Sequence, residues 1–453
     1  MWIINRLIKT LLVCCLLSVF PLNSQADVRL KGEVVWEGDV VLKEATIVEA
    51  DASLTIKAGT RVQVLNPQAK LTIGGGLQAL GTADRPVRFE APGWVGIHLV
   101  EPRGESRFSH VHFENAETAI SAIAARFSVK DSRFDNCKHG INLLRESGPL
   151  IAGNHFSGGE IGIDIEMRSY PKVTGNRFEQ LSKVAIYASH NSKGLIEQNK
   201  ISGCQVGVQI TQPYPDRVLR NHFVDNKVGI FCNQTKNTPQ IDGNVFENNE
   251  KGVVNFSFAY PTLTNNRFVG NDKAVHNDQY GSALIEFNAF SKNETAIYNN
   301  RKSNPKIRHN NFEQNKLVLF CDYSSYPLVR QNNFLSNPEV VRLGIYQSAD
   351  WEKRSGSKRL MMAESQARKT RNTMLTQAPT EFVDKVDVAE NFWGDQNQRI
   401  AAARDDANLD LFWDRHDQPK VVYEGFGPDE YVLDLVVFRP PLPTAVEKAG
   451  PQK

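Results

Sequence analysis

NHFSGGEIGI (residues 154–163) is one of several similar segments that recur along the chain, and this repeat decides the fold. NRFEQLSKVAI (176–186), NHFVDNKVGI (221–230) and NRFVGNDKAV (266–275) follow the same pattern. Each segment begins with Asn, carries Phe two residues later, and then places Gly or Ala before a β-branched residue. A repeat at a fixed period is typical of solenoid proteins, in which every repeat forms one coil.

The Phe position recurs through eleven coils at steps of 21 to 23 residues, and a second apolar column lies five residues before it. Apolar and polar positions alternate with period two, which predicts short strands rather than helices. Equivalent residues of neighbouring coils should lie about 4.8 Å apart and fill a narrow core. The column consists of Phe113, Phe134, Phe156, Phe178, Ile201, Phe223, Phe246, Phe268, Phe290, Phe312 and Phe334.

Asn stands two residues before the Phe position in nine consecutive coils. An amide side chain tolerates unusual turn angles and can bond to the equivalent amide one coil away. We therefore expect a ladder of asparagines along one corner of the solenoid. Its members are Asn154, Asn176, Asn199, Asn221, Asn244, Asn266, Asn288, Asn310 and Asn332.

These features predict one all-β domain, a parallel β-helix with coils of about 22 residues and capped ends. The tail should be disordered, because it is rich in proline and polar residues. The expected parts are a signal peptide (1–26), an N-terminal cap with the opening coils (27–107), regular coils (108–348), a basic irregular excursion (349–385), the last coil with a C-terminal cap (386–439) and the disordered tail (440–453).

The first 26 residues have a basic start, an apolar run from Thr10 to Leu22 and small residues before Asp27. This is the layout of a secretory signal peptide, so we expect cleavage near Ala26 and a periplasmic or secreted protein. No later stretch is long and apolar enough for stable membrane insertion. The formal net charge is only +2, which gives no indication of a nucleic-acid partner.

The repeat resembles that of right-handed, single-stranded parallel β-helix proteins of the pectin-lyase-like superfamily. SLTIKAGTRVQV (53–64) and GWVGIHL (93–99) look like opening coils of exported bacterial members, and NFWGDQ (391–396) looks like their last coil. The repeat is also similar to that of the periplasmic copper-binding accessory proteins of nitrous oxide reductase maturation. The superfamily contains lyases, hydrolases, epimerases, adhesins and non-enzymes, so the resemblance implies a fold and leaves the activity open.

Four cysteines follow the signal peptide: Cys137, Cys204, Cys232 and Cys321. The first two share one column three coils apart, and the last two share another column four coils apart. At about 4.8 Å per coil these separations are about 14 and 19 Å, whereas a disulfide needs Cα atoms within about 7 Å. We therefore predict four free, buried thiols, and we expect no metal and no cofactor.

Asp164 and Glu166 stand at alternate positions of one predicted strand, so their carboxylates should point the same way about 7 Å apart. Glycoside hydrolysis needs two carboxylates roughly 5 to 9.5 Å apart, and Arg168 follows closely. The other interpretation is a pair of solvated charges. The motifs of pectin hydrolases in the superfamily do not occur as a set, so we assign no catalytic residue.

Two further groups resemble metal ligands. His112, His155 and His222 share a basic column, and acidic residues stand two positions along, which predicts cross-paired surface charges rather than a metal site. An acidic cluster after the last coil either holds calcium through oxygen ligands or caps a helix. Its members are Asp405, Asp406, Asp410, Asp414, His416 and Asp417.

Tyrosines recur at the corner that ends each coil, often next to proline. Rings repeated along a rod can stack on the sugars of an extended glycan. The other interpretation is that each ring simply covers its own corner. The predicted ligand-binding residues are Tyr170, Tyr187, Tyr214, Tyr260, Tyr280 and Tyr326, where Tyr187 lies on a strand beside Asp164.

We therefore predict an exported binding or scaffold protein whose partner is an extended polysaccharide or another cell-surface polymer. One alternative is a polysaccharide lyase, hydrolase or epimerase that uses Asp164, Glu166 and Arg168. Another is a periplasmic accessory protein for metalloenzyme maturation. The basic excursion (349–385) could dock a protein partner or remain a solvated loop.

Overall fold

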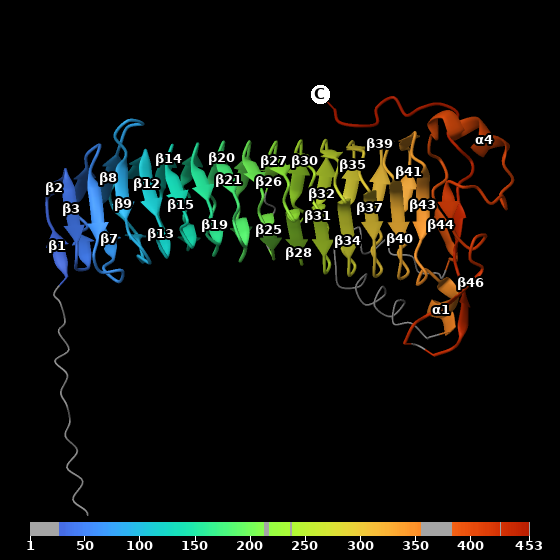
Figure 1. Ribbon diagram of the computed structural model, residues 1–453, viewed down its shortest axis with the longest axis horizontal. Helices are drawn as coiled ribbons and strands as arrows, with labels where there is room; N and C mark the ends of the chain where they lie inside the picture. Colours follow the sequence, from blue (N-terminus) through green and yellow to red (C-terminus); the bar gives the residue numbers. More distant parts are fainter. Residues whose placement is uncertain (1–26, 213–216, 236–237, 355–382, 426, 453) are drawn as a thin grey trace, which may run out of the picture.

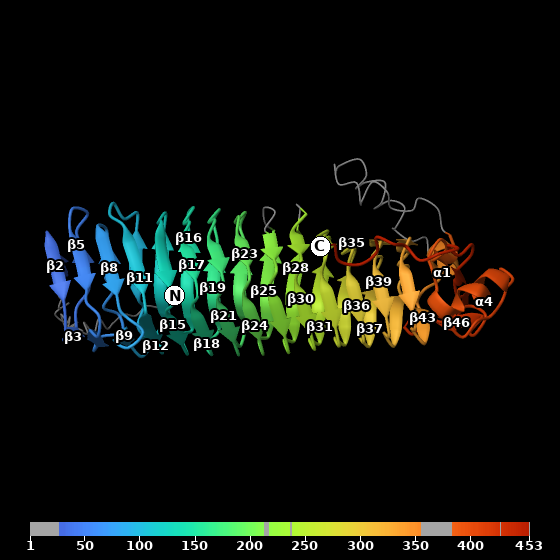
Figure 2. The same ribbon diagram turned by 90° about the horizontal axis from the view of Figure 1, so that it is seen from above.

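The computed structural model describes residues 27–212, 217–235, 238–354, 383–425 and 427–452. The chain winds into a long rod of stacked coils, and most coils contribute one short strand to each of three parallel sheets (Figure 1). Sheet A has 16 strands, and sheets B and C have 14 strands each. The predicted all-β parallel β-helix is therefore confirmed. Figure 2 shows the same rod from above, with the strands running across its axis.

Sheet A contains, in spatial order, β1 (Val28–Leu30), β4 (Thr46–Val48), β7 (Leu71–Ile73), β10 (Ile97–Val100), β13 (Thr118–Ile123), β16 (His139–Leu144), β19 (Ile161–Ile165), β22 (Val184–Ala188), β25 (Val206–Thr211), β28 (Val228–Asn233), β31 (Lys251–Phe256), β34 (Lys273–Asp278), β37 (Thr295–Asn299), β40 (Leu317–Cys321), β43 (Glu339–Leu343) and β45 (Phe412–Trp413).

Sheet B contains β2 (Glu33–Trp36), β5 (Ser53–Ile56), β8 (Gly76–Leu80), β11 (Ser106–Ser109), β14 (Phe127–Lys130), β17 (Leu150–Ala152), β20 (Lys172–Thr174), β23 (Leu195–Glu197), β26 (Arg217–Leu219), β29 (Gln240–Asp242), β32 (Thr262–Thr264), β35 (Leu284–Glu286), β38 (Lys306–Arg308) and β41 (Leu328–Arg330).

Sheet C contains β3 (Asp39–Leu42), β6 (Arg61–Val64), β9 (Val87–Glu90), β12 (Val111–Glu114), β15 (Arg133–Asp135), β18 (His155–Ser157), β21 (Arg177–Glu179), β24 (Lys200–Ser202), β27 (His222–Val224), β30 (Val245–Glu247), β33 (Arg267–Val269), β36 (Ala289–Ser291), β39 (Asn311–Glu313) and β42 (Asn333–Leu335).

The core is a continuous stack of apolar side chains along the rod axis. The rings of the Phe column lie face to face between neighbouring coils, with centroids 4.5 Å apart for Phe134 and Phe156 and 4.7 Å apart for Phe246 and Phe268. Ile201 takes the same position in register between Phe178 and Phe223. The predicted column is therefore confirmed, and offset stacking adds to the free energy gained by burying each ring.

The predicted asparagine ladder satisfies the backbone at the corner between sheets B and C. Asn176 shows the pattern: its Nδ2 donates to Asn199 Oδ1 at 3.0 Å and to the Ile151 carbonyl at 2.9 Å. Its own Oδ1 accepts the backbone N–H of Asn154 at 2.9 Å. Each buried amide side chain thus provides hydrogen-bond partners for backbone groups that, at a turn, have no partner in a neighbouring strand. The ladder continues from Asn332 to Asn391 of the last coil.

Two further ladders were not predicted. One runs along the next corner through Asn226, Asn249, Asn271, Asn293, Asn315 and Asn337. The other runs inside sheet A through Asn255, Asn277 and Asn299 and ends on Cys321 Sγ, which Asn299 Nδ2 approaches to 3.8 Å. Within each of these columns, successive residues lie one coil apart in the sequence, as they do in the first ladder. The same spacing rule would therefore have found them.

The surface histidines pair with acidic residues of the next coil, as predicted. His112 Nε2 lies 2.6 Å from Asp135, and His155 Nε2 lies 2.8 Å from Glu179. His222 Nε2 lies 3.1 Å from Glu247. This column is therefore made of cross-strand charge pairs.

The four cysteines are free and buried, as predicted from their columns: Cys137, Cys204, Cys232 and Cys321. Burial raises the pKa of Cys204 to about 11 and that of Cys137 to about 12. These two thiols therefore stay protonated at neutral pH.

The C-terminal end of the rod is closed by a compact cap. Strand β45 ends sheet A, and the cap contains α1 (Ala349–Arg354), β44 (Lys385–Asp387), the 3-10 turn η1 (Gly394–Gln396), α4 (Asn397–Ala402), β46 (Lys420–Val422), β47 (Glu430–Val432) and β48 (Leu435–Val437). Strand β44 pairs in parallel with β48, and β46 pairs with β47 in antiparallel fashion. No helix among the described residues is long and apolar enough to span a membrane.

The tail differs from our expectation of disorder. Residues 440–452 are described, and the chain returns along the outside of the coils from the cap (Figure 1). Val446 exchanges two hydrogen bonds with the Asn333 side chain at 2.8 and 3.1 Å. Further along, the Asn311 Nδ2 donates to the Ala449 carbonyl at 3.1 Å. The composition was misleading because surface amides supply the partners that the tail itself lacks.

Within the predicted N-terminal cap and opening coils (27–107), the first strand of the coils begins at Val28. Strands β1, β2 and β3 are the first strands of their sheets and pair on one side only among the described residues. The predicted signal peptide (1–26) and most of the predicted basic excursion, residues 355–382, lie outside the described residues.

Candidate functional site

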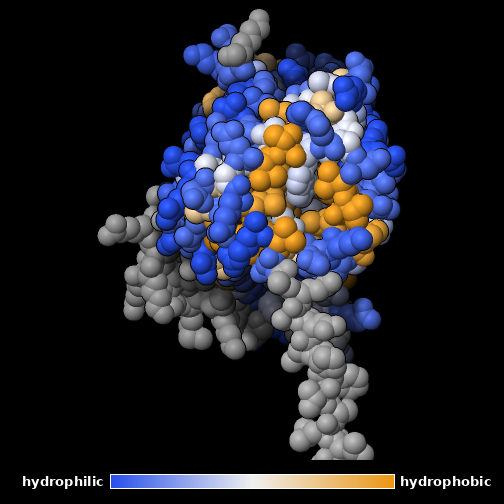
Figure 3. All heavy atoms as spheres, turned by 90° about the vertical axis from the view of Figure 1, so that its left-hand side faces the viewer, coloured by the Kyte–Doolittle hydropathy of each residue, from blue (hydrophilic) through white to orange (hydrophobic). Residues whose placement is uncertain are grey.

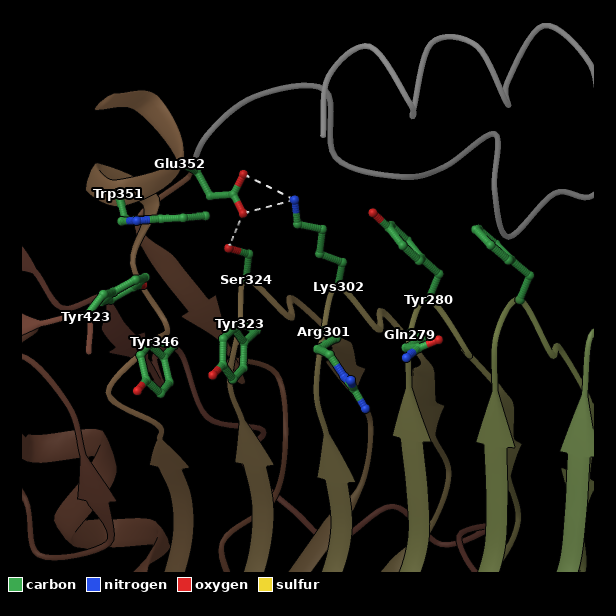
Figure 4. A pocket seen from close by; sticks show the side chains of 11 residues that line it. Gln279, Tyr280, Arg301, Lys302, Tyr323, Ser324, Tyr346, Trp351, Glu352 and Tyr423 are labelled. Carbon is green, nitrogen blue, oxygen red and sulfur yellow. Dashed lines mark hydrogen bonds and ion pairs between the residues drawn. The ribbon is translucent and has the colours of Figure 1, made fainter. Parts of the chain in front are cut away.

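A pocket of about 310 Å³ lies at the corner between sheets A and B, close to the cap (Figure 4). Five coils contribute to it through the residues that follow β31, β34, β37, β40 and β43, and helix α1 adds a wall. We call it the corner pocket. It is lined by Phe258, Gln279, Tyr280, Arg301, Lys302, Tyr323, Ser324, Tyr346, Trp351, Glu352 and Tyr423.

The backbone of the corner explains why these side chains form rows. In successive coils two consecutive residues have left-handed backbone angles, for example Gln279 (φ 48°) with Tyr280 (φ 66°) and Arg301 (φ 46°) with Lys302 (φ 64°). This conformation costs a non-glycine residue roughly 1–2 kcal/mol. It recurs in four of the five coils that line the pocket, so equivalent side chains repeat in rows along the rod, as Figure 4 shows.

Aromatic rings form most of the wall at the cap end. Tyr323 and Tyr346 stack with centroids 4.4 Å apart, and Trp351 stacks on Tyr423 at 5.2 Å. Tyr346 meets Tyr423 edge to face at 4.8 Å, which joins the two pairs into one cluster. At the other end of the pocket Phe258 stacks on Tyr280, with ring centroids 4.9 Å apart.

The charged groups in and behind the wall are matched in sign. Arg301 forms an ion pair with the buried Asp278 carboxylate. Lys302 Nζ lies 3.2 Å from Glu352 Oε1, and Ser324 Oγ donates to the same oxygen at 2.6 Å. Glu352 is only 1% exposed, so its charge depends on these partners. Two cations and two carboxylates leave the corner pocket close to neutral.

Two buried carboxyl groups support the aromatic wall from behind. Asp322 Oδ1 accepts the backbone N–H groups of Tyr323 and Tyr346, both at 2.9 Å. Asp434 accepts the Ala349 N–H at the start of α1 at 2.8 Å. Burial raises the pKa of each carboxyl to about 6. They fix the ring positions through the backbone and do not line the pocket themselves.

A second aromatic row continues from the pocket onto the outer face of sheet A. Tyr298 stacks on Phe320 of the next coil with centroids 4.6 Å apart, and His276 meets Tyr298 edge to face at 4.8 Å. Lys273 Nζ lies 4.2 Å from the centroid of the Tyr298 ring. Burial lowers the pKa of His276 to about 4, so this imidazole is neutral at pH 7.

The predicted tyrosines do not share one environment. Tyr280 lines the corner pocket. Tyr170 is exposed, and its hydroxyl accepts a hydrogen bond from Arg126 Nε at 3.3 Å. Tyr187 lies on β22 in register with Asp164.

The other three tyrosines lie elsewhere. Tyr260 is buried, and burial raises its pKa. Tyr326 donates its hydroxyl to Asp434 Oδ2 at 2.8 Å and so anchors the cap. Tyr214 lies outside the described residues. Of the five described tyrosines that were predicted to bind a ligand, only Tyr280 therefore lines the pocket, and binding by the other four stays a prediction.

The predicted carboxylate pair is only partly assembled. Asp164 on β19 is 8% exposed, and its Oδ1 has no hydrogen-bond partner among the described residues. Burial, and then the nearby charge of Glu166, raise the pKa of Asp164 to about 7. Arg168, by contrast, pairs with Glu146 at 2.9 Å. The structure thus gives Asp164 a pKa suited to proton transfer, but the predicted basic partner is paired elsewhere.

No group of three or more potential metal ligands occurs among the described residues. The acidic cluster of the cap is instead paired: Asp410 with Arg399 at 2.8 Å, and Asp406 with Arg404 at 3.1 Å. Asp414 accepts the backbone N–H of Val436 at 2.7 Å.

Sequence reasoning missed most of the corner pocket. Tyr323 and Tyr346 belong to the repeat and could have been found by comparing the residues that follow each sheet A strand. Trp351 lies beyond the last regular coil, and Tyr423 comes from the cap. No periodic signal identifies these two residues.

The stacked coils, their parallel sheets and the Phe and Asn columns define a right-handed parallel β-helix of the pectin-lyase-like kind. Residues 109–268 match the family model of the right-handed β-helix region. Residues 229–397, which include most of the corner pocket, match the model described as periplasmic copper-binding protein (NosD).

None of the curated proteins compared with the chain matches it. Among solved structures, one described as a new PL6 alginate lyase complex with trisaccharide aligns with 69% of this chain and 80% of that chain. The sequence identity is 12% and the TM-score is 0.29.

Proposed function

We propose that the chain is an exported binding protein that holds an extended polysaccharide in the corner pocket. The observation that carries this proposal is the aromatic cluster of Tyr323, Tyr346, Trp351 and Tyr423 around one cavity. Aromatic faces bury the apolar face of a sugar ring at little entropic cost, and the tyrosine hydroxyl adds a polar contact. A concave, largely apolar site with a few polar groups is the usual form of a small-ligand pocket.

The charges of the pocket favour a neutral or weakly charged sugar. Arg301 and Lys302 are already paired with Asp278 and Glu352, so an acidic sugar would have to compete for these cations. Breaking a pair that includes a buried carboxylate costs several kcal/mol. Neutral hydroxyl groups can instead hydrogen-bond to the same side chains without displacing their partners.

The row on sheet A supports an extended ligand. Tyr298 and Phe320 precede the corner residues of the same coils, so the rings lie on the strands that lead to the pocket. A glycan that fills the pocket has a second set of rings along which its next sugars can stack. This agrees with an extended polymer better than with a single sugar.

The second candidate function is metal handling, and the match of residues 229–397 to the copper-binding family model favours it. The buried thiols and the paired histidines of the coils do not offer copper an open soft-ligand site. Titration of the purified protein with Cu(I) and Cu(II), followed by metal analysis after desalting, tests this candidate.

The test of the proposed function is a screen against insoluble and gel-immobilised polysaccharides, combined with an assay for released reducing ends and unsaturated products. Retention on a polysaccharide without product, reduced at least tenfold by Tyr346→Ala, supports the binder. Product release that is lost in Asp164→Asn, with Tyr346→Ala still active, would make the protein an enzyme and overturn the proposal.

A further inference from the structure

The N-terminal end of the rod exposes apolar residues and open strand edges. Figure 3 looks along the rod at this end and shows a central apolar patch surrounded by hydrophilic residues. Val28, Val35 and Val41 are 42%, 52% and 48% exposed, and they belong to β1, β2 and β3. Exposed edges of this kind are templates for pairing with another chain.

The core itself is open at this end. Val28 is in register with the buried Thr46, and Trp36 is in register with the buried Ile56, so both side chains point into the solenoid. They remain partly exposed because no described strand precedes theirs. At the two corners of the first coil, the space beside Gly32 and Gly38 is empty within 4 Å.

We infer that this end binds the same end of a second copy, so that two rods join head to head about a two-fold axis. Two identical coils that face each other run in opposite directions around the common rod axis. Their edge strands therefore meet in antiparallel fashion. A closed two-fold contact of this kind is the commonest symmetry of protein oligomers.

The length of the first coil fixes which residues meet. Val28 pairs with Thr46, so the first coil takes 18 residues, from 28 to 46. A two-fold axis that passes through the corner residue Gly32 also passes through the residue half a coil further along, on the opposite side of the coil. This residue is Val41 in β3. With this axis β1 faces β2 of the second copy, and β3 faces β3.

This register matches the inward-pointing side chains in both polarity and direction. Inward-pointing Val28 lies opposite Trp36 of the second copy, and Leu30 lies opposite Val34. The outward-pointing residues meet one another as well, because the side chains of all three strands alternate with period two. The patch of one copy thus extends the core of the other.

Two charge pairs are complementary in the same register, whereas Asp27 faces Glu37 of the second copy as a like-charge pair. Lys31 lies opposite Glu33 of the second copy, and by symmetry this pair occurs twice. In β3, Asp39 lies opposite Lys43 of the second copy. Residues 31, 33, 39 and 43 are exposed, so each can reach a partner across the contact. Opposite charges directly across an antiparallel pair are stabilising, and like charges are destabilising.

The pairing would produce a rod of about twice the length. Sheet A has 16 strands, so one copy is about 70 Å long at about 4.8 Å per strand. The corner pocket lies near the opposite end, and the dimer therefore carries two pockets far apart. If the corner pocket binds polysaccharide, as the proposed function states, the two distant pockets of the dimer would bind one long polymer with avidity.

The test uses the protein purified in its exported form, analysed by sedimentation equilibrium and small-angle X-ray scattering. We expect a concentration-dependent dimer of twice the monomer mass, with a maximum dimension about twice that of the monomer. Lys31→Glu and Glu33→Lys should each weaken dimerisation at least tenfold. The double variant should restore it, because each site then regains an opposite pair.

Lys227→Glu is the matched control, since this exposed lysine lies on a regular coil far from the N-terminal end, and it should leave dimerisation unchanged. A protein that is monomeric at all concentrations overturns the inference. So does a dimer that is compact rather than elongated, or one that both single variants leave intact. Polysaccharide binding by single rods is measured separately. If the proposed function fails, the dimerisation result therefore still tests the inferred head-to-head contact.

Discussion

Replacement of Asn244 by leucine should weaken the solenoid locally at the asparagine ladder. Asn244 Oδ1 accepts the backbone N–H of Asn221 at 2.8 Å, and its Nδ2 donates to the Val218 carbonyl at 2.8 Å. Leucine has a similar size but provides neither partner. The substitution therefore removes these two hydrogen bonds and three further ones, with Asn221 Nδ2, the Asp242 carbonyl and Asn266 Oδ1, at a site that is completely buried.

The magnitude follows from the groups left without these partners. A buried polar group without a hydrogen bond costs about 1–3 kcal/mol. Two such groups, the Asn221 N–H and the Val218 carbonyl, give about 2–6 kcal/mol, and we expect about 3 kcal/mol because the corner can relax. At 1.4 kcal/mol per tenfold change, the opening equilibrium should rise about 100-fold.

The assay is amide hydrogen exchange by mass spectrometry on peptides that cover β26, β29 and β32. Glu250→Leu is the control, because the residue is exposed, lies on the same coil and loses only a surface ion pair with Lys251 at 3.3 Å. It should change exchange less than fivefold. Equal exchange rates in Asn244→Leu and the wild type would refute the ladder as a stabilising element.

Three further outcomes follow from the structure. The pKa of Asp322 is about 6 in the folded protein against about 3.9 in the unfolded chain, so its contribution to stability falls as pH rises through 6. The free energy of unfolding of Asp322→Asn should therefore gain about 1 kcal/mol relative to the wild type between pH 5 and pH 7. Denaturant titrations that show no such gain would contradict the burial argument. Thiol titration of the unfolded, unreduced exported protein should find about four free thiols, and a value near zero would mean that the cysteine columns are wrong. Asn333→Ala removes both hydrogen bonds to Val446 and should make the tail after Pro440 at least tenfold more sensitive to limited proteolysis, whereas unchanged cleavage would show that the side chain does not hold the tail.

Most of the fold was predictable because it is periodic. The step of about 22 residues places Phe134 on Phe156 and Asn176 on Asn199, and the structure confirms both contacts. The free cysteines followed from the same columns. In each case one spacing rule converts sequence position into spatial position.

The site and the two ends were not predictable in this way. Trp351 and Tyr423 follow the last regular coil, where the spacing rule no longer applies, and they reach the pocket only through the fold of the cap. Tyr260 and Tyr326 share a sequence position next to proline, yet one is buried and the other bonds to Asp434. A pattern of residue types identifies a corner but does not give the exposure of each ring.

The most direct test of the proposed function is calorimetric titration of the exported protein with soluble fragments of whichever polysaccharide it retains. Trp351→Ala removes a ring of the corner pocket, and Tyr170→Ala removes an exposed ring that lies on a distant coil. We expect Trp351→Ala to weaken binding at least tenfold, in keeping with the loss of an aromatic stacking contact, and Tyr170→Ala to leave it unchanged. Binding that survives Trp351→Ala but is lost in Tyr170→Ala would contradict the corner pocket and return the site to the tyrosine edge predicted from the sequence.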